Sequence, residues 1–533
     1  MFVRKKKNSS GSISVQIIEK VNAKSKLVET IGYSKDLMQV EKLYVKAKQR
    51  IEELEPNLFS LSNKQEKQDI FKGITNTQIR SIGDELIFGK LFYELGCDKV
   101  FQSIKNIRKI DEKVFLFKSL VLSRILYQGS KLYLIDYLSY FKHKNMDKEV
   151  IYRFLDTIYE DKLKSQIEQC IFEYTNKKMN NTIAFTFYDV TTLYFESESE
   201  DDLRRIGFSK EGKIARPQIQ LGLFTTLEGY PLSFEVYEGN KYEGHTLVDI
   251  LKKFQTKFKL KHKPVVVADR GMLNNDNIAY LENNGYKYIL AAKIKNISND
   301  LKEKIANLTF IDDSTTHTLK FNKDIPYKDD NEQKQSINIY QRLVLSYSTQ
   351  RAKKDKYNRD KALQRLEKKI QSSKSITKKD LKLSYYAKYL NINDNKCDIK
   401  YRLNPSKILN DEKLDGIKGF ITNDFTLDAN EIISHYNNQY DVERAFRISK
   451  TDLKIRPIYH RLETRIKAHI LISFVSYAVY KKFESKMKEA NINIQRKLLL
   501  DIIKTFYAID LDDKLHQLEF DELQKKIYDA VYQ

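Results

Sequence analysis

The stretch Thr182-Ile-Ala-Phe-Thr-Phe-Tyr-Asp189 decides the fold, because a dense apolar and β-branched run ends there in a carboxylate. Such a run, bounded by polar residues, predicts a buried strand. A second buried strand over residues 264–268 ends in the same way at Asp269. Strand ends in an α/β sheet border the crevice in which ligands bind. We therefore predict that Asp189 and Asp269 share a site, although aspartate is also common where a strand gives way to a turn.

The sequence around these two strands predicts a mixed α/β sheet. A hairpin is expected over residues 218–226 and 231–237, with a Glu-Gly turn between its strands. Helical periodicity follows at 246–258 and 274–283, and another apolar strand is predicted at 286–294. Strands that alternate with helices indicate a sheet with helices packed on its faces.

The region before residue 179 is mainly helical by pattern. A hairpin of residues 12–17 and 26–31 and a helix beginning at Leu37 are expected first. No proline occurs between Pro56 and Pro217. Apolar stripes with helical period within that span lie at 84–95, 112–127, 131–141 and 148–172.

Residues 295–414 interrupt the α/β pattern. Their most charged part, 351–370, has nine basic and three acidic residues. It is either a solvated helix or a strip that contacts the DNA backbone. An apolar strand resumes at 416–422, so we interpret 295–414 as an insertion within an α/β domain.

The composition is that of a folded, strongly basic protein. The 533 residues include 94 Lys and Arg against 72 Asp and Glu, a net charge of +22, and 41% hydrophobic residues argue against general disorder. This charge favours a polyanionic partner, although lysine-rich composition also reflects genome bias. Three separated cysteines, Cys97, Cys170 and Cys397, form no disulfide framework or CxxC zinc pattern, which favours a reducing cytoplasm. No signal peptide and no bilayer-spanning run is predicted.

A third acidic residue lies on a predicted helix that Asp428 and Glu431 can cap. Spacings of three, four, four and three residues place five polar side chains on one face of this helix. They are Tyr436, Gln439, Glu443, Arg447 and Lys450. By spacing alone, this face is either part of a site or an ordinary solvated stripe with a Glu443–Arg447 ion pair.

This helix resembles the signature of the DDE transposases of the IS4 superfamily, most closely the IS1634 group: Tyr, two residues, Arg, three residues, Glu, six residues, Lys. Tyr436, Glu443 and Lys450 match in register, and Gln439 replaces the arginine. Six further matching segments cover the chain from about residue 2 to 480. They begin at Phe2, Tyr188, Gly239, Ala268, Ser346 and Asp452.

The resemblance implies an RNase H-like catalytic domain in which Asp189, Asp269 and Glu443 are catalytic and hold two divalent metal ions. Carboxylate ligands suit Mg²⁺, for which Mn²⁺ can substitute. It also implies that the signature helix contacts DNA phosphates. The DNA-binding residues would be Tyr436, Gln439, Arg447 and Lys450. Because Gln439 brings no charge, Arg444 or Arg447 compensates for it, or terminal DNA is bound more weakly.

The implied function is that of an insertion-sequence transposase, which cleaves DNA at terminal inverted repeats and transfers the strands to target DNA. A homodimer in a synaptic complex, in the nucleoid of a prokaryotic cytoplasm, is implied with it. Two alternatives stay open: a metal-dependent DNA nuclease of the same fold, and a decayed transposase that only binds DNA, for which Gln439 is the support.

The expected domains follow from these patterns and the resemblance. They are an N-terminal β-hairpin and helix (1–58), a helical DNA-binding domain (59–178), the RNase H-like catalytic domain in two parts (179–294 and 415–485), a partly β insertion domain (295–414) and a C-terminal helical region (486–533).

Overall fold

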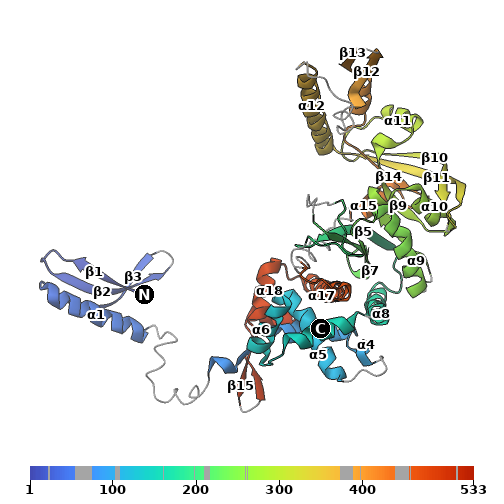
Figure 1. The fold of residues 1–533 in the computed structure, drawn as a ribbon. Helices are drawn as coiled ribbons and strands as arrows, with labels where there is room; N and C mark the ends of the chain where they lie inside the picture. The colour runs from blue at the N-terminus through green and yellow to red at the C-terminus, as the bar shows by residue number, and fades with distance from the viewer. Residues whose placement is uncertain are drawn as a thin grey trace. The chain divides into compact units, whose positions relative to one another are not determined.

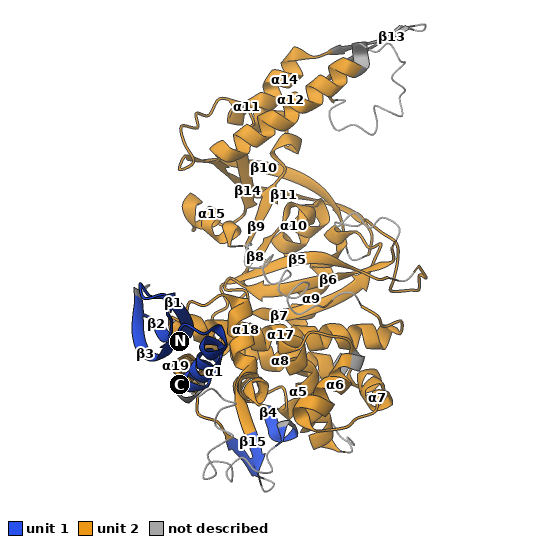
Figure 2. Cartoon of the chain, turned by 90° about the vertical axis from the view of Figure 1, so that its left-hand side faces the viewer, with its two compact units in different colours: residues 1–80, 509–516 blue, residues 81–508, 517–533 orange. Residues whose placement is uncertain are grey.

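The computed structural model of the chain forms two compact units (Figure 2). Unit 1 comprises residues 1–80 and 509–516, and unit 2 comprises residues 81–508 and 517–533. The residues that the structure describes are 1–21, 24–54, 75–102, 109–159, 161–196, 198–208, 216–258, 260, 262–329, 331–371, 388–395, 398–438, 455, 458–511 and 514–533.

Unit 1 contains a three-stranded antiparallel sheet in the order β1-β2-β3, with one helix after it. Its elements are β1 (Phe2–Lys7), β2 (Ile13–Val21), β3 (Lys24–Ser34) and α1 (Leu37–Leu54). Val15 and Ile17 of β2 form a small apolar core with Val40 and Ala47 of α1. The predicted hairpin and helix are therefore present, and the basic N-terminus adds a strand that the sequence patterns did not indicate.

A helical assembly makes up one part of unit 2. Its helices are the π-helical turn η3 (Asp84–Gly89), α3 (Lys90–Glu94), α4 (Lys99–Gln102), α5 (Ile110–Leu126), α6 (Lys131–Lys142), α7 (Lys148–Ile158), α8 (Asp161–Lys178), α17 (Glu463–Glu489), α18 (Arg496–Lys504) and α19 (Glu522–Tyr532). A small sheet in the order β16-β15-β4 pairs β16 (Lys514–Gln517), β15 (Tyr507–Leu511) and β4 (Ile79–Ser81). Most of its residues, 79–80, 509–511 and 514–516, belong to unit 1.

Helix α17 is the central helix of this assembly. All thirteen residues from Ala468 to Tyr480 are buried, as expected for a helix that is packed on every side. The apolar stripe over 148–172 is not one helix, because Tyr159 leaves helical geometry between α7 and α8. No helix among the described residues has the length and apolar character needed to cross a membrane.

The other part of unit 2 contains an eight-stranded mixed sheet (Figure 1). Its strand order is β10-β11-β14-β9-β8-β5-β6-β7, and all eight strands are labelled in Figure 2. Strands β5, β8 and β9 are parallel, and the remaining pairs are antiparallel. The strands are β5 (Phe185–Tyr194), β6 (Gln218–Thr226), β7 (Pro231–Glu238), β8 (Val265–Ala268), β9 (Tyr288–Ala292), β10 (Thr316–Lys328), β11 (Lys334–Tyr347) and β14 (Ile417–Thr422). The predicted mixed α/β sheet is confirmed.

Alternate residues of the central strands enter two different cores. Phe187 and Val267 pack with α17 on one face, whereas Tyr188 and Val266 pack with α9 (Thr246–Phe258) and α10 (Asn275–Asn283) on the other. Since successive side chains of a strand point to opposite faces, helices on both faces explain why these strands are continuously apolar in sequence.

The region predicted as an insertion contributes to this sheet, because β10 and β11 extend it beyond β14. The basic segment 351–370 lies in a helix, α12 (Thr349–Gln371), whose role toward DNA stays a prediction. The region also contains α11 (Asn299–Ala306), β12 (Leu390–Asn395), β13 (Asp398–Leu403) and α14 (Pro405–Glu412).

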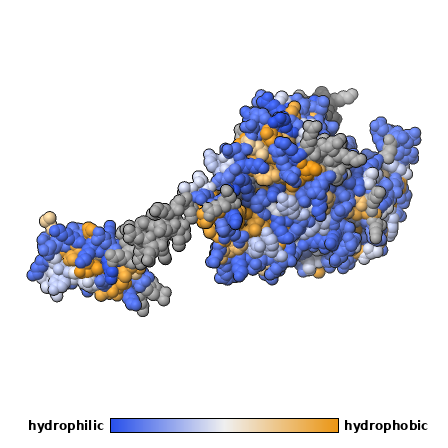
Figure 3. All heavy atoms as spheres, turned by 90° about the horizontal axis from the view of Figure 1, so that it is seen from below, coloured by the Kyte–Doolittle hydropathy of each residue, from blue (hydrophilic) through white to orange (hydrophobic). Residues whose placement is uncertain are grey.

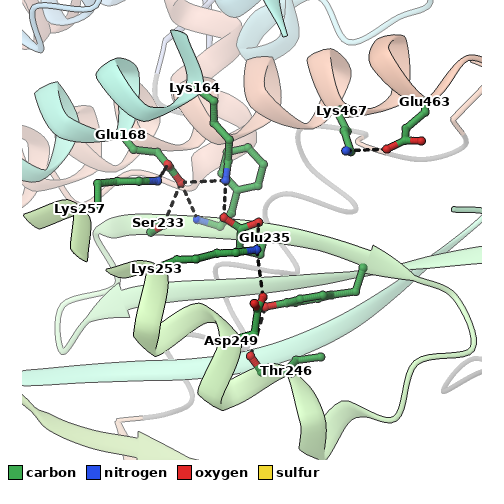
Figure 4. A network of polar contacts seen from close by, with 12 residues as sticks. Lys164, Glu168, Ser233, Glu235, Thr246, Asp249, Lys253, Lys257, Glu463 and Lys467 are labelled. Carbon is green, nitrogen blue, oxygen red and sulfur yellow. Dashed lines mark hydrogen bonds and ion pairs between the residues drawn. The ribbon is translucent and has the colours of Figure 1, made fainter. Parts of the chain in front are cut away.

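A buried ionic network joins the helical assembly to the edge strand β7 (Figure 4). The Glu168 side chain of α8 is 0% exposed and accepts hydrogen bonds from Ser233 Oγ (2.9 Å) and Phe234 N (3.0 Å). Lys257 of α9 donates to the same carboxylate, and Lys164 pairs with Glu235 at 2.6 Å. Every charge in this cluster therefore has a partner, as a buried charge requires.

Replacing Glu168 with alanine should destabilise unit 2 by about 3–5 kcal/mol, because Lys257 and the Phe234 amide would lose their buried partner. Denaturant unfolding followed by circular dichroism measures this change. Glu173→Ala, at an exposed position of the same helix, is the matched control and should cost less than about 0.5 kcal/mol. Equal effects of the two substitutions would contradict this account of the network.

Candidate active site

Asp189 and Asp269 lie side by side on neighbouring parallel strands. The last paired residues of β5 and β8 are Tyr188 and Ala268, so the two aspartates follow the same step of the ladder. Adjacent strands are about 4.8 Å apart. Both aspartates are half-buried, and Asp189 Oδ1 accepts a hydrogen bond from Val190 N at 2.8 Å.

The structure corrects one detail of the sequence interpretation. Asp189 does not end its strand, since β5 continues to Tyr194 and pairs Asp189 with Leu223 of β6. The strand that ends here is β8. After Asp269, the chain forms a 3₁₀ turn, η5 (Arg270–Met272). Asp189 therefore lies beside the point where the neighbouring strand stops.

Tyr436 joins the two aspartates from a different element, α15 (Ala429–Asn437). Its Oη donates a hydrogen bond to Asp269 Oδ1 at 3.2 Å, and its ring packs on Phe420 of β14 at a centroid distance of 4.7 Å. The preceding residue, His435, stacks on Phe185 of β5 at 3.9 Å. These contacts hold the C-terminal turn of α15 on the strands that carry the carboxylates.

The predicted capping residues fix the beginning of α15. Asp428 accepts from the backbone of Glu431, and the Glu431 side chain accepts from the backbone of Asp428. Such a capping box satisfies two amide groups that the first turn leaves without helical partners. The start of α15 is thus encoded in the sequence.

The electrostatic environment keeps Tyr436 protonated. Burial and the neighbouring Asp269 carboxylate raise its pKa well above that of a free tyrosine, Asp189 raises it further, and Arg270 lowers it. Both aspartates therefore lie within electrostatic reach of this phenol. At neutral pH Tyr436 acts only as a neutral hydrogen-bond donor toward Asp269.

Two asparagines hold the turn that follows Asp269. The side-chain amide groups of Asn274 and Asn277 donate to the Gly244 carbonyl oxygen at 3.0 and 2.7 Å, and Asn277 also donates to Met272 O at 2.8 Å. A Cβ atom on Gly244 would lie 2.5 Å from the Tyr242 ring and 2.6 Å from Asn274 Nδ2, so a larger residue there would displace one of these side chains. Segment 239–247, one of the segments that resemble the transposase family, therefore helps to hold the turn that follows Asp269.

Sequence reasoning missed these asparagines, and only the helix-capping position of Asn274 was visible as a signal. The histidines of the matching segments lie elsewhere. His245 is exposed and has an edge contact with Tyr242, and His460 is buried against Tyr152 and His469.

A cleft of about 570 Å³ opens beside Asp269 and Tyr436. It is lined by more basic than acidic side chains, and Lys295 pairs with Asp411 at 2.7 Å within it. Such a lining favours a polyanion. The basic residues are Arg270, Lys293, Lys295, Arg351, Arg359 and Lys418, and the acidic residues are Asp269, Asp355 and Asp411.

The structure thus brings Asp189, Asp269 and Tyr436 together. The other four predicted site residues, Gln439, Glu443, Arg447 and Lys450, lie outside the described residues. Within the described ranges, no group of three or more His, Cys, Asp or Glu side chains could hold a metal ion. Two adjacent carboxylates are nevertheless the donor type that a hard divalent cation prefers, so they fit the implied metal.

A comparison of solved structures found a similar protein, a piggyBac transposase in a synaptic complex with hairpin DNA, determined by cryo-EM. The two chains are 10% identical, the match covers 82% of this chain and 80% of the other, and the TM-score is 0.37. No curated protein matches the chain.

A family model described as a transposase DDE domain matches residues 181–479, more than half of the chain. The matched range includes both aspartates, Tyr436 and the first part of the central helix α17, up to residue 479. The chain therefore belongs to the family of DDE transposase domains, and it is a DDE transposase.

Proposed function

We propose that this transposase is of the IS1634 group in the IS4 superfamily and that it cuts DNA at the terminal inverted repeats of its element and joins the freed ends to target DNA. The observation that carries this proposal is the position of Tyr436, the first residue of the transposase signature, on the Asp269 carboxylate. The family match covers the same residues.

An RNase H-like catalytic domain is part of the proposal. It is supported by the order β7-β6-β5-β8-β9, in which three antiparallel strands are continued by two parallel strands. Helix α9 connects β7 to β8, helix α10 connects β8 to β9, and both helices cover one face of the sheet. We retain the proposed domain division, with the helical residues 59–178 binding DNA and residues 295–414 forming the insertion.

Asp189, Asp269 and Glu443 would hold divalent metal ions, with Mg²⁺ as the proposed metal. When bound, two such ions stabilise the attacking and leaving oxygens of an in-line displacement at phosphorus. The chain's own groups prepare this site, because Tyr436 fixes the orientation of Asp269 through its hydrogen bond.

DNA would be held by charge and hydrogen bonds around the carboxylates. The basic lining of the cleft beside Asp269 suits the phosphate backbone, which supplies most of the affinity for DNA. In the signature helix, Lys450 and Arg447 would contribute positive charge and Gln439 a neutral donor. A homodimer would bring the two ends of the element together.

The proposal is tested with purified protein and a labelled duplex that carries the terminal repeat. Nicking at the repeat boundary in Mg²⁺, its absence in EDTA and joining of 3′ ends to a second duplex are expected. Cutting without joining would favour a nuclease, and specific binding without cutting in Mg²⁺ or Mn²⁺ would indicate a decayed transposase.

Asp189→Asn should reduce nicking by more than about 100-fold while DNA affinity stays within twofold, because the change removes a metal ligand rather than a phosphate contact. Nicking rates and binding isotherms on the same duplex measure the two effects. Asp202→Asn is the matched control, since the Asp202 side chain is solvent-exposed and contacts Arg205. Normal nicking by Asp189→Asn would refute the metal assignment.

Tyr436→Phe should lower the nicking rate about 10-fold and raise the Mg²⁺ concentration for half-maximal rate, because the hydrogen bond to a charged group is lost. Single-turnover rates over a Mg²⁺ series separate this effect from a general loss of structure. Tyr459→Phe removes the hydroxyl of a tyrosine that is 72% exposed and should change neither quantity. A half-maximal Mg²⁺ concentration unchanged by Tyr436→Phe would argue against the positioning role.

A further inference from the structure

One face of the sheet β1-β2-β3 in unit 1 is covered by α1, and among the residues of unit 1 that the structure describes no other α-helix covers the opposite face. On the covered face, a Cβ atom on Gly32 would lie 2.9 Å from the Leu43 side chain, and Arg50 pairs with Glu29 at 3.2 Å. Val15 and Ile17 point to the same face, where they pack in the core. Gln16, between them, and Ser14, before Val15, therefore point to the opposite, outer face.

Two cross-strand rows occupy this outer face. Register places Arg4 opposite Gln16 and Gln16 opposite Thr30, and Arg4 Nη2 donates to Gln16 Oε1 at 2.8 Å. The second row contains Lys6, Ser14 and Tyr33. Arg4, Lys6 and Thr30 are exposed and Tyr33 is 73% exposed, whereas Ser14 is buried and accepts a hydrogen bond from Asn8 Nδ2 at 2.6 Å.

The N-terminal part of unit 1 carries an excess of positive charge, which favours a polyanionic partner. Residues 1–54 contain twelve Lys and Arg against six Asp and Glu, and neither row contains an acidic residue. Two of those acidic residues, Glu29 and Glu41, pair with Arg50 and Lys5. Hydrophilic side chains cover most of the surface that Figure 3 shows, in keeping with this composition.

We propose that this outer face, formed by the rows Arg4–Gln16–Thr30 and Lys6–Ser14–Tyr33, binds duplex DNA in the major groove. The major groove is about 12 Å wide and admits a two-stranded β-ribbon. Strands β1 and β2, which carry Arg4, Lys6 and Gln16, form such a ribbon. Arg and Gln side chains can read guanine and adenine edges, and Lys contacts phosphate. This inference rests on the proposed function, in which DNA is the substrate. The proposed function itself assigns no DNA contact to a residue of the unit 1 sheet.

A second copy of the chain is the other occupant to consider, because Phe2 (41% exposed) and Leu27 (49% exposed) lie on the same sheet. In a two-fold dimer through this face, the same patch of each copy would take part, so the positive charges of Arg4 and Lys6 would be present on both sides of the interface. Like charges across an interface oppose association. Charge complementarity therefore favours DNA.

The test compares two full-length double variants that each lose two positive charges from unit 1. Arg4→Gln with Lys6→Gln alters the outer face, and Lys42→Gln with Lys46→Gln alters exposed positions of α1. Affinity for the terminal-repeat duplex is measured over a NaCl series, with circular dichroism as the check on folding and light scattering as the check on oligomeric state.

The outer-face variant should bind at least about 10-fold more weakly at 150 mM salt, and the slope of log K against log salt should fall by about one to two. The α1 variant should stay within twofold of the unaltered protein. Equal losses in both variants, normal binding by the outer-face variant, or loss of self-association with DNA binding retained would each overturn the proposal.

Failure of this proposal is distinguishable from failure of the proposed function. If the unaltered protein binds the duplex but neither nicks nor joins it, the proposed function fails, while a selective binding defect of the outer-face variant still supports this surface. If the protein nicks and joins normally and the two double variants bind alike, only this proposal fails.

Discussion

The parallel pairing of β5 with β8 places two carboxylates at neighbouring positions, and the surrounding structure has to accommodate their repulsion. Two unit charges about 5 Å apart repel by roughly 3 kcal/mol at an effective dielectric constant of about 20. The donor group of Tyr436 and the positive charge of Arg270 lie close enough to offset part of this cost. A bound divalent cation would offset more, so the proposed metal ions would be favoured by the same geometry that costs stability.

The rigidity of this arrangement comes from elements that are distant in sequence. Tyr436 reaches Asp269 across 167 positions of the chain, and Asn277 reaches the Gly244 carbonyl across 33. At the sheet's edge, β7 is covered by α8 and α9 through the ionic cluster around Glu168. Covering an edge strand prevents pairing with another chain, and here it also ties the helical assembly to the sheet.

The sequence predicts the local part of this structure well, because local patterns encode it. Apolar runs mark β5 and β8, and the capping residues Asp428 and Glu431 mark the start of α15. Strand register is non-local, so the sequence does not show that β6 continues to pair beyond Asp189 or that β10 and β11 extend the sheet. The break at Tyr159 was missed because apolar periodicity continues through it.

The site shows the same division between local and non-local information. Asp189, Asp269 and Tyr436 were predicted as site residues from strand ends and from a motif, and they meet in space. No local sequence pattern predicts that Asn274 and Asn277 contact Gly244. Their hydrogen bonds to its carbonyl oxygen depend on the tertiary fold, because Gly244 lies 30 and 33 positions earlier in the chain.

The division of the chain into two compact units bears on how DNA affinity and chemistry can be combined. Contacts made by unit 1, which has its own apolar core, would add to affinity as a second binding module on the same chain. The carboxylates instead need a fixed geometry, which Tyr436 and the turn after Asp269 supply within unit 2. The DNA sequence preference that the proposal assigns to unit 1 and the catalytic chemistry could then change independently. Substitutions on the outer face of the small sheet would not disturb the strands of unit 2 that hold the carboxylates.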